Sequence, residues 1–95
     1  MCYTYVVRFT WDDKKAAANV KKHGVSFEEA ATVFGDPLAL VVDDAVHPNR
    51  EILIGQSERQ RVLLTIYIEL DEDEVRIISA RRATAHERRR YEENP

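Results

Sequence analysis

The stretch RVLLTIYIELDEDEVRIISA, residues 61–80, contains two apolar runs that are separated by four acidic residues. In the first run, from Arg61 to Glu69, apolar side chains alternate onto both faces of an extended chain: Val62, Leu64, Ile66 and Ile68 on one face, and Leu63, Thr65 and Tyr67 on the other. Apolar groups on both faces indicate a central strand that is covered on both sides, at least in part. The second run, from Val75 to Ala80, follows after a turn across residues 70–73. So short a connection favours an antiparallel hairpin.

The segment that precedes these strands predicts a strand and a helix. Tyr3–Phe9 is rich in β-branched and aromatic residues, which favour a strand. Asp12 and Asp13 favour the start of a helix because their negative charge interacts well with its N-terminal dipole. Gly24 favours the end of that helix, since glycine readily adopts the left-handed conformation of a C-terminal cap. The expected apolar stripe of the helix consists of Ala16, Ala17 and Val20.

A second helix begins at Ser26, which forms a capping box with Glu29. Its apolar residues recur at helical spacing and predict one continuous buried face: Phe27, Ala30, Ala31 and Phe34. Two short helices around Gly24 are also compatible with a helix-turn-helix in residues 13–34. The second helix of that motif donates hydrogen bonds to DNA bases, whereas this one exposes Glu28 and Glu29 and has no Lys or Arg. We therefore exclude a DNA-reading role.

The remainder of the chain predicts two further strands and a final helix. Apolar residues at 38–42 and alternating ones at 52–55 favour strands. A second capping box, Thr84 with Glu87, predicts a helix to about Glu92. In this helix only Ala85 and Tyr91 are apolar, and they do not share a face, so it needs a partner, an anion or its own ion pairs. The expected order is β-α-α-β-β-β-β-α: an α+β fold with two helices packed on a curved antiparallel sheet.

Length and composition indicate one soluble domain across residues 1–95. The net charge is −3, so total charge gives no indication of nucleic acid, but five arginines lie between residues 81 and 90. Cys2 is the only cysteine and cannot form an intramolecular disulfide. No metal-ligand spacing occurs, so we expect no metal and no cofactor. No apolar stretch approaches the roughly 20 residues of a membrane span, and we expect a cytoplasmic protein.

The arginines at one end of the hairpin suggest a phosphate site. Arginine binds phosphate through two parallel hydrogen bonds and keeps its proton. Arg81 and Arg82 end the last strand, and Arg59 and Arg61 lie at the start of the strand before it, so the hairpin brings Arg61 near the level of Arg81 and Arg82. The alternative is that these arginines offset acidic residues on neighbouring elements. Both interpretations remain open from the residues alone.

The last turn of the first helix contains Lys22 and His23. Imidazole is the side chain that ordinarily changes charge near neutral pH, which makes His23 the best general acid or base in the chain. A cation at the C-terminal end of a helix also stabilises the helix dipole. His47, in a turn, and His86, among arginines, are poorer candidates.

Two longer stretches, FTWDDKKAAANVKKHGVSFEEAATVFGDPLAL and RIISARRATAHERRRYE, resemble the BrnT toxins of the DUF497 group across nearly the whole chain. The patterns W-D-x-x-K-x-x-x-N-x-x-K-H-G-V-x-F-x-x-A and I-S-A-R-x-A-x-x-x-E-R-x-x-Y both occur, in order and well separated. The resemblance implies a RelE-like fold and a type II toxin that cleaves RNA without a metal. It also implies a cognate, BrnA-like antitoxin with a DNA-binding domain, so that a hetero-oligomer of the two binds operator DNA.

The resemblance, together with the hairpin argument for Arg61, selects the candidate site residues. We expect His23, Arg61 and Arg81 to be catalytic, His23 as acid or base and the two arginines as phosphate clamps. Residues expected to bind RNA are Lys15, Lys22, Arg59, Arg82, Arg88 and Tyr91. The rival hypothesis is a non-catalytic binding module whose arginine cluster binds an acidic protein partner.

Overall fold

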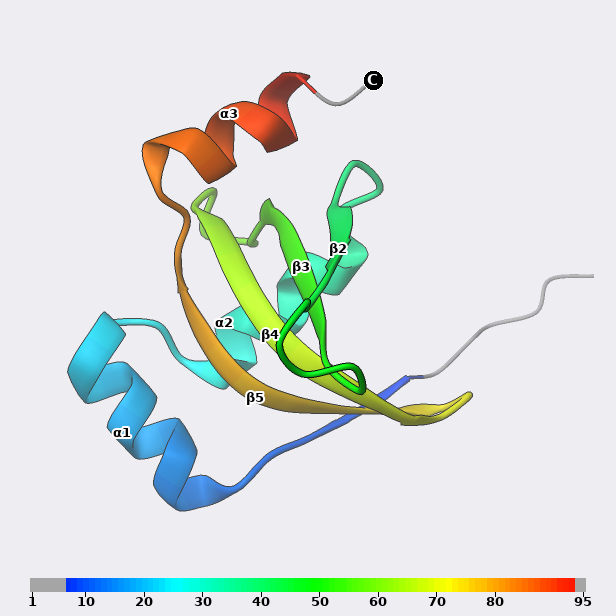
Figure 1. Ribbon diagram of the computed structural model, residues 1–95. Coiled ribbons are helices and arrows are strands. Elements are labelled where there is room, and N and C mark those ends of the chain that lie inside the picture. Colours follow the sequence, from blue (N-terminus) through cyan, green and yellow to red (C-terminus); the bar gives the residue numbers. More distant parts are fainter. Residues whose placement is uncertain (1–6, 94–95) are drawn as a thin grey trace, which may run out of the picture.

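The computed structural model describes residues 7–93 (Figure 1). Its elements follow the expected order along the chain. They are β1 (Arg8–Thr10), α1 (Asp13–His23), α2 (Phe27–Thr32), the 3-10 turn η1 (Val33–Gly35), β2 (Leu40–Asp43), β3 (Glu51–Gln56), β4 (Val62–Asp71), β5 (Glu74–Arg82) and α3 (Ala85–Glu93). The strand expected at residues 3–9 lies partly outside the described residues, and within them it comprises Arg8–Thr10. No helix of the described residues is long and apolar enough to cross a membrane.

The five strands form one curved sheet in the order β1-β5-β4-β3-β2 (Figure 1). The strands β2 to β5 make the expected antiparallel meander, and β4 is central. The expectation of a wholly antiparallel sheet is wrong at one edge, because β1 pairs in parallel with β5. The two strands are separated by both N-terminal helices and by β2, β3 and β4, so no tight turn forces them to run in opposite directions.

The main core lies between β3–β5 and the segment from Val25 to η1. Its fully buried side chains include Val25, Phe27 and Leu63. On the opposite face of the sheet, Ile54 and Leu64 are buried as well. The central strand is therefore covered on both sides in part, as its sequence predicts.

The two helices differ in how they attach to the sheet. The apolar face of α2 is confirmed, since Phe27 and Ala30 are buried and Ala31 and Phe34 are partly buried. The apolar stripe expected for α1 is wrong. Val20 is 48% exposed and Ala17 is exposed too, and of the three residues only Ala16 packs against the core.

A buried amide holds α1 in place instead. Asn19 Nδ2 donates to the carbonyl of Val25 at 2.9 Å and to that of Ala80 at 2.8 Å. Its Oδ1 accepts from the backbone N–H of Ala80 at 3.2 Å. Because a buried polar group must find partners, Asn19 fixes α1 to β5 more specifically than a few alanine contacts would.

The C-terminal helix lies at one end of the sheet (Figure 1) and buries none of its residues. It begins with the predicted capping box: Thr84 N donates to Glu87 Oε1, and Glu87 N donates to Thr84 Oγ1. The hydroxyl of Tyr91 donates to Asp36 Oδ2 at 2.5 Å. Polar contacts, in place of an apolar face, therefore dock this helix.

Candidate functional site

Arg61, at the start of β4, is fixed by a carboxylate of α2. Its Nε donates to Glu29 Oε2 at 2.9 Å, its Nη2 donates to Glu29 Oε1, and Nη2 also reaches the carbonyl of Gly24 at 3.2 Å. Glu29 is only 3% exposed and accepts a further bond from Ser57 Oγ at 2.7 Å. The hydrogen bond from Arg61 is the main reason that the pKa of Glu29 lies below its usual range.

This arrangement corrects two expectations about Glu29. Ser26 Oγ accepts from Glu29 N at 3.0 Å, so half of the predicted capping box forms. The other half of the box requires the Glu29 side chain to accept from the backbone N–H of Ser26. That side chain instead accepts from Arg61 and Ser57. Glu29 is also buried, not exposed as the helix-turn-helix argument assumed. A buried carboxylate needs strong partners, and Arg61 and Ser57 supply them.

Arg81, near the end of β5, is fixed in a similar way by α3. Its Nη1 and Nη2 donate to the two carboxylate oxygens of Glu87, each at 2.8 Å. Hydrogen bonding by Arg81 lowers the pKa of Glu87 to about 2. The two arginines that we selected as phosphate clamps are thus each paired with a glutamate of a neighbouring element.

Beside Arg61 lies a small polar cavity of about 60 Å³, which we call the arginine pocket. Its lining residues are Gln60, Arg61, Val62, Arg82, Ala83 and Arg88. The register of the hairpin places Leu63 opposite Arg82 and Leu64 opposite Arg81, which brings the start of β4 beside the end of β5. The pocket brings Arg82 and Arg88 beside Arg61, as the hairpin argument expected of Arg82, but Arg81, the other expected phosphate clamp, does not line it.

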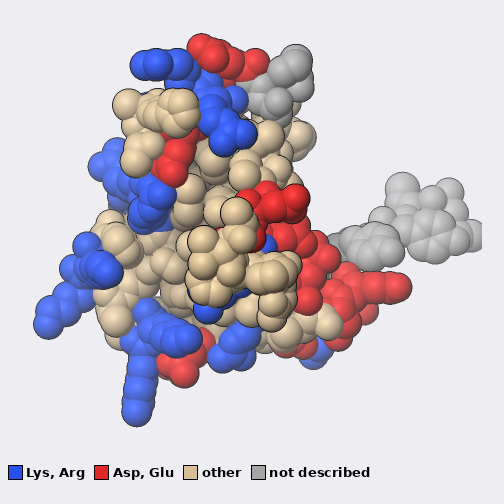
Figure 2. All heavy atoms as spheres, in the orientation of Figure 1, with Lys and Arg blue, Asp and Glu red and all other residues tan. Residues whose placement is uncertain are grey.

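The arginine pocket keeps free positive charge. Within residues 7–93, Arg82 and Arg88 form no salt bridge, and Nη1 of Arg61 donates no hydrogen bond. Arg59 lies in the preceding turn with a side chain 70% exposed, and its Nη1 is 3.9 Å from Glu29 Oε1. Figure 2 shows Lys and Arg side chains over α1, the end of β5 and α3, and acidic ones over the β4–β5 turn.

The expected residues of α1 lie on a neighbouring element. His23 is half-buried at the end of α1 and directly precedes Gly24, whose carbonyl contacts Arg61. Lys22 and Lys15 are exposed on the same helix. The end of α1 therefore contacts Arg61, which lines the arginine pocket.

Tyr91 lies outside the arginine pocket and has a different environment. Burial, and the hydrogen bond that its hydroxyl donates to Asp36, raise the pKa of Tyr91 to about 12. Asp36 also accepts from the backbone N–H groups of Gln56 and Leu38. Tyr91 therefore links α3 to the loop after η1 and to β3.

Three residues of this region were not selected from the sequence: Glu29, Glu87 and Asp36. Glu87 could have been found, because a glutamate six residues after Arg81, at the start of a helix, lies within reach of it. Glu29 and Asp36 meet partners 32 and 55 positions away, and no local pattern marks such pairs. Among the residues that the structure describes, no group of three or more His, Cys, Asp or Glu side chains could hold a metal ion.

Comparison with known proteins identifies the family of this chain. Residues 11–87 match the family model described as "Ribonuclease toxin, BrnT, of type II toxin-antitoxin system". The crystal structure of the Brucella abortus ribonuclease toxin BrnT has a similar fold, with a TM-score of 0.69 and 22% identity, over 83% of this chain and 99% of that one. No curated protein sequence matches. The family match covers most of the sequence, and the chain therefore belongs to the BrnT family of ribonuclease toxins of type II toxin–antitoxin systems.

Proposed function

We propose that this protein is a metal-independent endoribonuclease toxin with a RelE-like fold, which inhibits translation and growth in the cytoplasm. The observation that carries the proposal is the arginine pocket, because three arginines line it and two of them form no salt bridge within the described residues. Family membership supplies the reaction class. The pocket supplies a place where one phosphate group of RNA can bind.

RNA cleavage without a metal uses the 2′-hydroxyl of the ribose as the nucleophile. Its oxygen attacks the adjacent phosphorus in line, the bond from phosphorus to the 5′-oxygen breaks, and the products are a cyclic phosphate and a free 5′-hydroxyl. A base must accept the proton of the 2′-hydroxyl and an acid must protonate the leaving oxygen. Cationic donors must stabilise the negative charge that develops on the phosphate.

The side chains around the arginine pocket divide these tasks between them. Arg82, Arg88 and the free Nη1 of Arg61 are the donors to the phosphate oxygens. Their charge takes the electrostatic part that a metal ion has in other nucleases. His23, beside the Gly24–Arg61 contact, is the general acid or base. Arg81 already donates to both carboxylate oxygens of Glu87. It can act as a phosphate clamp only through a further hydrogen bond to a phosphate oxygen, made while Glu87 stays bonded.

The remaining basic residues bind the strand on either side of the cleaved bond. Arg59 extends from the turn next to the arginine pocket, and Lys15 and Lys22 lie exposed along α1. Tyr91, which is hydrogen-bonded to Asp36, supports α3 and so positions Arg88. In this proposal a BrnA-like antitoxin neutralises the toxin, and the hetero-oligomer binds operator DNA through the antitoxin.

The test is to incubate purified protein with total RNA in the presence of EDTA. We expect discrete fragments with cyclic phosphate and 5′-hydroxyl ends. The variant Arg82→Ala/Arg88→Ala should lose most of this cleavage. Its matched control is Arg89→Ala/Arg90→Ala, which removes two arginines of α3 that do not line the pocket.

Two results contradict the proposal. Cleavage that EDTA abolishes and magnesium restores rejects the metal-independent mechanism. Equal loss of cleavage in both double variants rejects the arginine pocket as the phosphate site and favours general attraction of RNA to the basic surface.

A further inference from the structure

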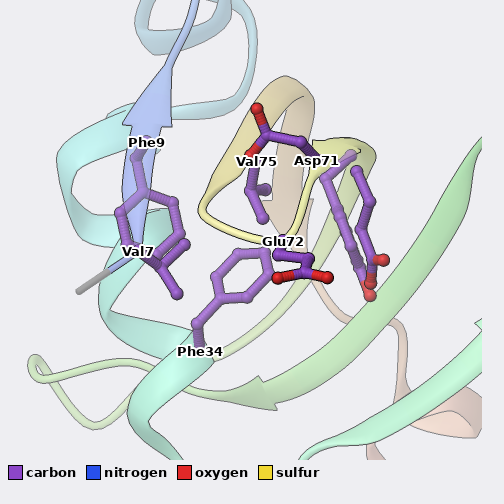
Figure 3. Close-up of a pocket in the computed structure, with 8 residues that line it drawn as sticks. Val7, Phe9, Phe34, Asp71, Glu72 and Val75 are labelled. Carbon is purple, nitrogen blue, oxygen red and sulfur yellow. The ribbon is translucent and has the colours of Figure 1, made fainter. Parts of the chain in front are cut away.

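A second and larger cavity lies at the opposite end of β4 from the arginine pocket (Figure 3). Its volume is about 280 Å³. Apolar and aromatic residues line its base: Val7, Phe9, Phe34, Tyr67 and Val75. Glu69 and Asp71 at the end of β4 and Glu72 in the turn after it complete the lining. We call it the acidic-rimmed pocket.

The base of this pocket is a row of aromatic rings. The ring centroids of Phe9 and Phe34 are 5.0 Å apart, and those of Phe34 and Tyr67 are 4.9 Å apart in an edge-to-face contact. Such contacts stabilise one fixed arrangement of the rings. Tyr67 is also anchored through its hydroxyl, which donates to Glu51 at 3.3 Å. The apolar surface is therefore formed before any ligand arrives.

The rim carries uncompensated negative charge. Glu69, Asp71 and Glu72 are all exposed, and within residues 7–93 none of them forms a salt bridge. Figure 3 shows Asp71 and Glu72 across the pocket from Val7 and Phe9, with Phe34 between the two sides. An apolar base below three carboxylates suits a ligand with one apolar group and positive charge around it.

We propose that the acidic-rimmed pocket docks a basic segment of a protein partner, which inserts one bulky apolar side chain between Lys or Arg residues. RNA is a poor occupant because its phosphates meet the three carboxylates. An inorganic cation is a poor occupant because aromatic and aliphatic carbons form the base. The chain's own residues 1–6, MCYTYV, contain two tyrosines but no Lys or Arg, so they do not match the charge of the rim.

The identification of this partner as the antitoxin rests on the proposed function. In that case the antitoxin contacts the toxin about the length of β4 away from the arginine pocket. Antitoxin binding and RNA cleavage then depend on separate residues, and a substitution can remove one and leave the other.

The direct test uses synthetic peptides and the full chain, labelled with ¹⁵N for NMR. The probe is Gly-Lys-Arg-Phe-Lys-Arg-Gly. We expect it to shift the amide signals of Phe9, Phe34 and Val75 and to leave those of Arg82 and Arg88 unchanged. Replacing the peptide's Phe by Ser should weaken binding about tenfold or more, since the apolar ring is then no longer buried against the base of the pocket. Replacing its Lys and Arg by Glu should abolish binding.

The variant Glu69→Gln/Asp71→Asn/Glu72→Gln removes the charge of the rim and keeps the side-chain volumes. It should bind the peptide about tenfold more weakly than the unchanged chain. The control Glu28→Gln/Glu58→Gln/Glu93→Gln removes three exposed carboxylates elsewhere and should bind as the unchanged chain does. RNA cleavage should be equal in all three proteins, because none of these residues lines the arginine pocket.

The possible outcomes separate this inference from the proposed function. Peptide binding that depends on the rim, in a chain that does not cleave RNA, supports the pocket and rejects the nuclease. Equal weakening in the two triple variants overturns the pocket, since it indicates nonspecific attraction. Binding that appears only when Tyr3 and Tyr5 are changed to Ala also overturns it, because the chain's own N-terminal residues are then the occupant.

Discussion

The guanidinium of Arg61 and the carboxylate of Glu29 form a two-point ion pair between the start of β4 and α2. The pair connects a buried carboxylate, 3% exposed, to a residue of the arginine pocket. Each partner satisfies the other, and within the described residues Nη1 of Arg61 donates no hydrogen bond. Glu29 thus acts as a positioning residue that fixes the direction of Arg61.

We predict that Glu29→Gln destabilises the fold by about 3 kcal/mol. The amide keeps the shape of the side chain but leaves the charge of Arg61 uncompensated, and removal of one member of a buried pair is strongly destabilising. Urea unfolding measures the change. Glu28→Gln is the control: Glu28 is exposed on the same helix, and its change should remain within about 0.5 kcal/mol. Equal stability of the two variants would show that the pair contributes nothing.

A second prediction concerns acid. The pKa of Glu87 is about 2 in the folded protein and has a reference value of 4.5, so the folded state favours its ionised form. The resulting stability is present above pH 4.5 and is lost as the pH falls toward 2. Its size is at most about 3 kcal/mol, and smaller in practice because Arg81 is partly exposed.

Thermal unfolding between pH 6 and pH 2 tests this prediction. The midpoint should fall with pH in the unchanged chain and fall less steeply in Glu87→Gln. Glu92→Gln, on the same helix and exposed, should retain the original slope. Identical profiles for Glu87→Gln and the unchanged chain would rule out the Arg81–Glu87 pair as the source.

A third prediction concerns salt. Binding of single-stranded RNA releases counterions, so the logarithm of the binding constant decreases linearly with the logarithm of the salt concentration. This dependence becomes less steep by about 0.7 for each phosphate contact that is lost. Arg82 and Arg88 share the one phosphate of the arginine pocket, so Arg82→Ala/Arg88→Ala should flatten the slope by about 0.7. Fluorescence titration of a labelled, uncleavable RNA between 50 and 300 mM salt measures it. An unchanged slope would mean that neither arginine contacts a phosphate.

The sequence predicted the parts of the fold that local patterns specify. The hairpin of β4 and β5, the Gly24 helix stop and the Thr84–Glu87 capping box all depend on residues within a few positions or across one short turn. The same locality predicted that arginines gather at one end of the sheet, since the hairpin determines which residues lie side by side.

Long-range partners could not be predicted from such patterns. The parallel pairing of β1 with β5, the burial of Asn19 and the Glu29–Arg61 pair join segments far apart in the chain. Asn19 is a polar residue, and from α1 alone we would expect its side chain to face solvent. Only packing against Ala80 makes the interior its better position.

His23 carries the fourth prediction. His23→Ala should lower the rate of RNA cleavage by about 10²- to 10⁴-fold, the range for loss of a general acid or base. Stability should change by no more than about 2 kcal/mol, the upper range for a helix-end charge. His47→Ala is the control, because His47 is exposed and pairs with Asp44 in a turn. If His23→Ala cleaved RNA at the full rate, the role of His23 would be limited to stabilising the end of α1.

The last prediction concerns α3 and the hydrogen bond that the hydroxyl of Tyr91 donates to Asp36. The helix buries no residue, so polar contacts are its main attachment to the domain. Tyr91→Phe removes the hydroxyl and leaves Asp36 with its two backbone donors. We expect a loss of about 1.5 kcal/mol, as for a hydrogen bond to a charged group.

Asp36→Asn and the double variant complete a thermodynamic cycle for this bond. The coupling between the two positions should be about 1 kcal/mol, and zero coupling would show that the bond contributes nothing in solution. Deletion of residues 84–95 removes both contacts of the helix and one wall of the arginine pocket. The shortened domain should still fold, with a loss of no more than a few kcal/mol, because the main core contains no residue of α3.

The same deletion should reduce RNA cleavage more than Tyr91→Phe does. Arg88 leaves with the helix in the first case, whereas in the second it remains on a less firmly held element. Circular dichroism establishes that the shortened chain is folded, and cleavage is then measured at equal folded concentration. A folded, shortened chain that cleaves RNA at the full rate would place the phosphate site on Arg61 and Arg82 without α3.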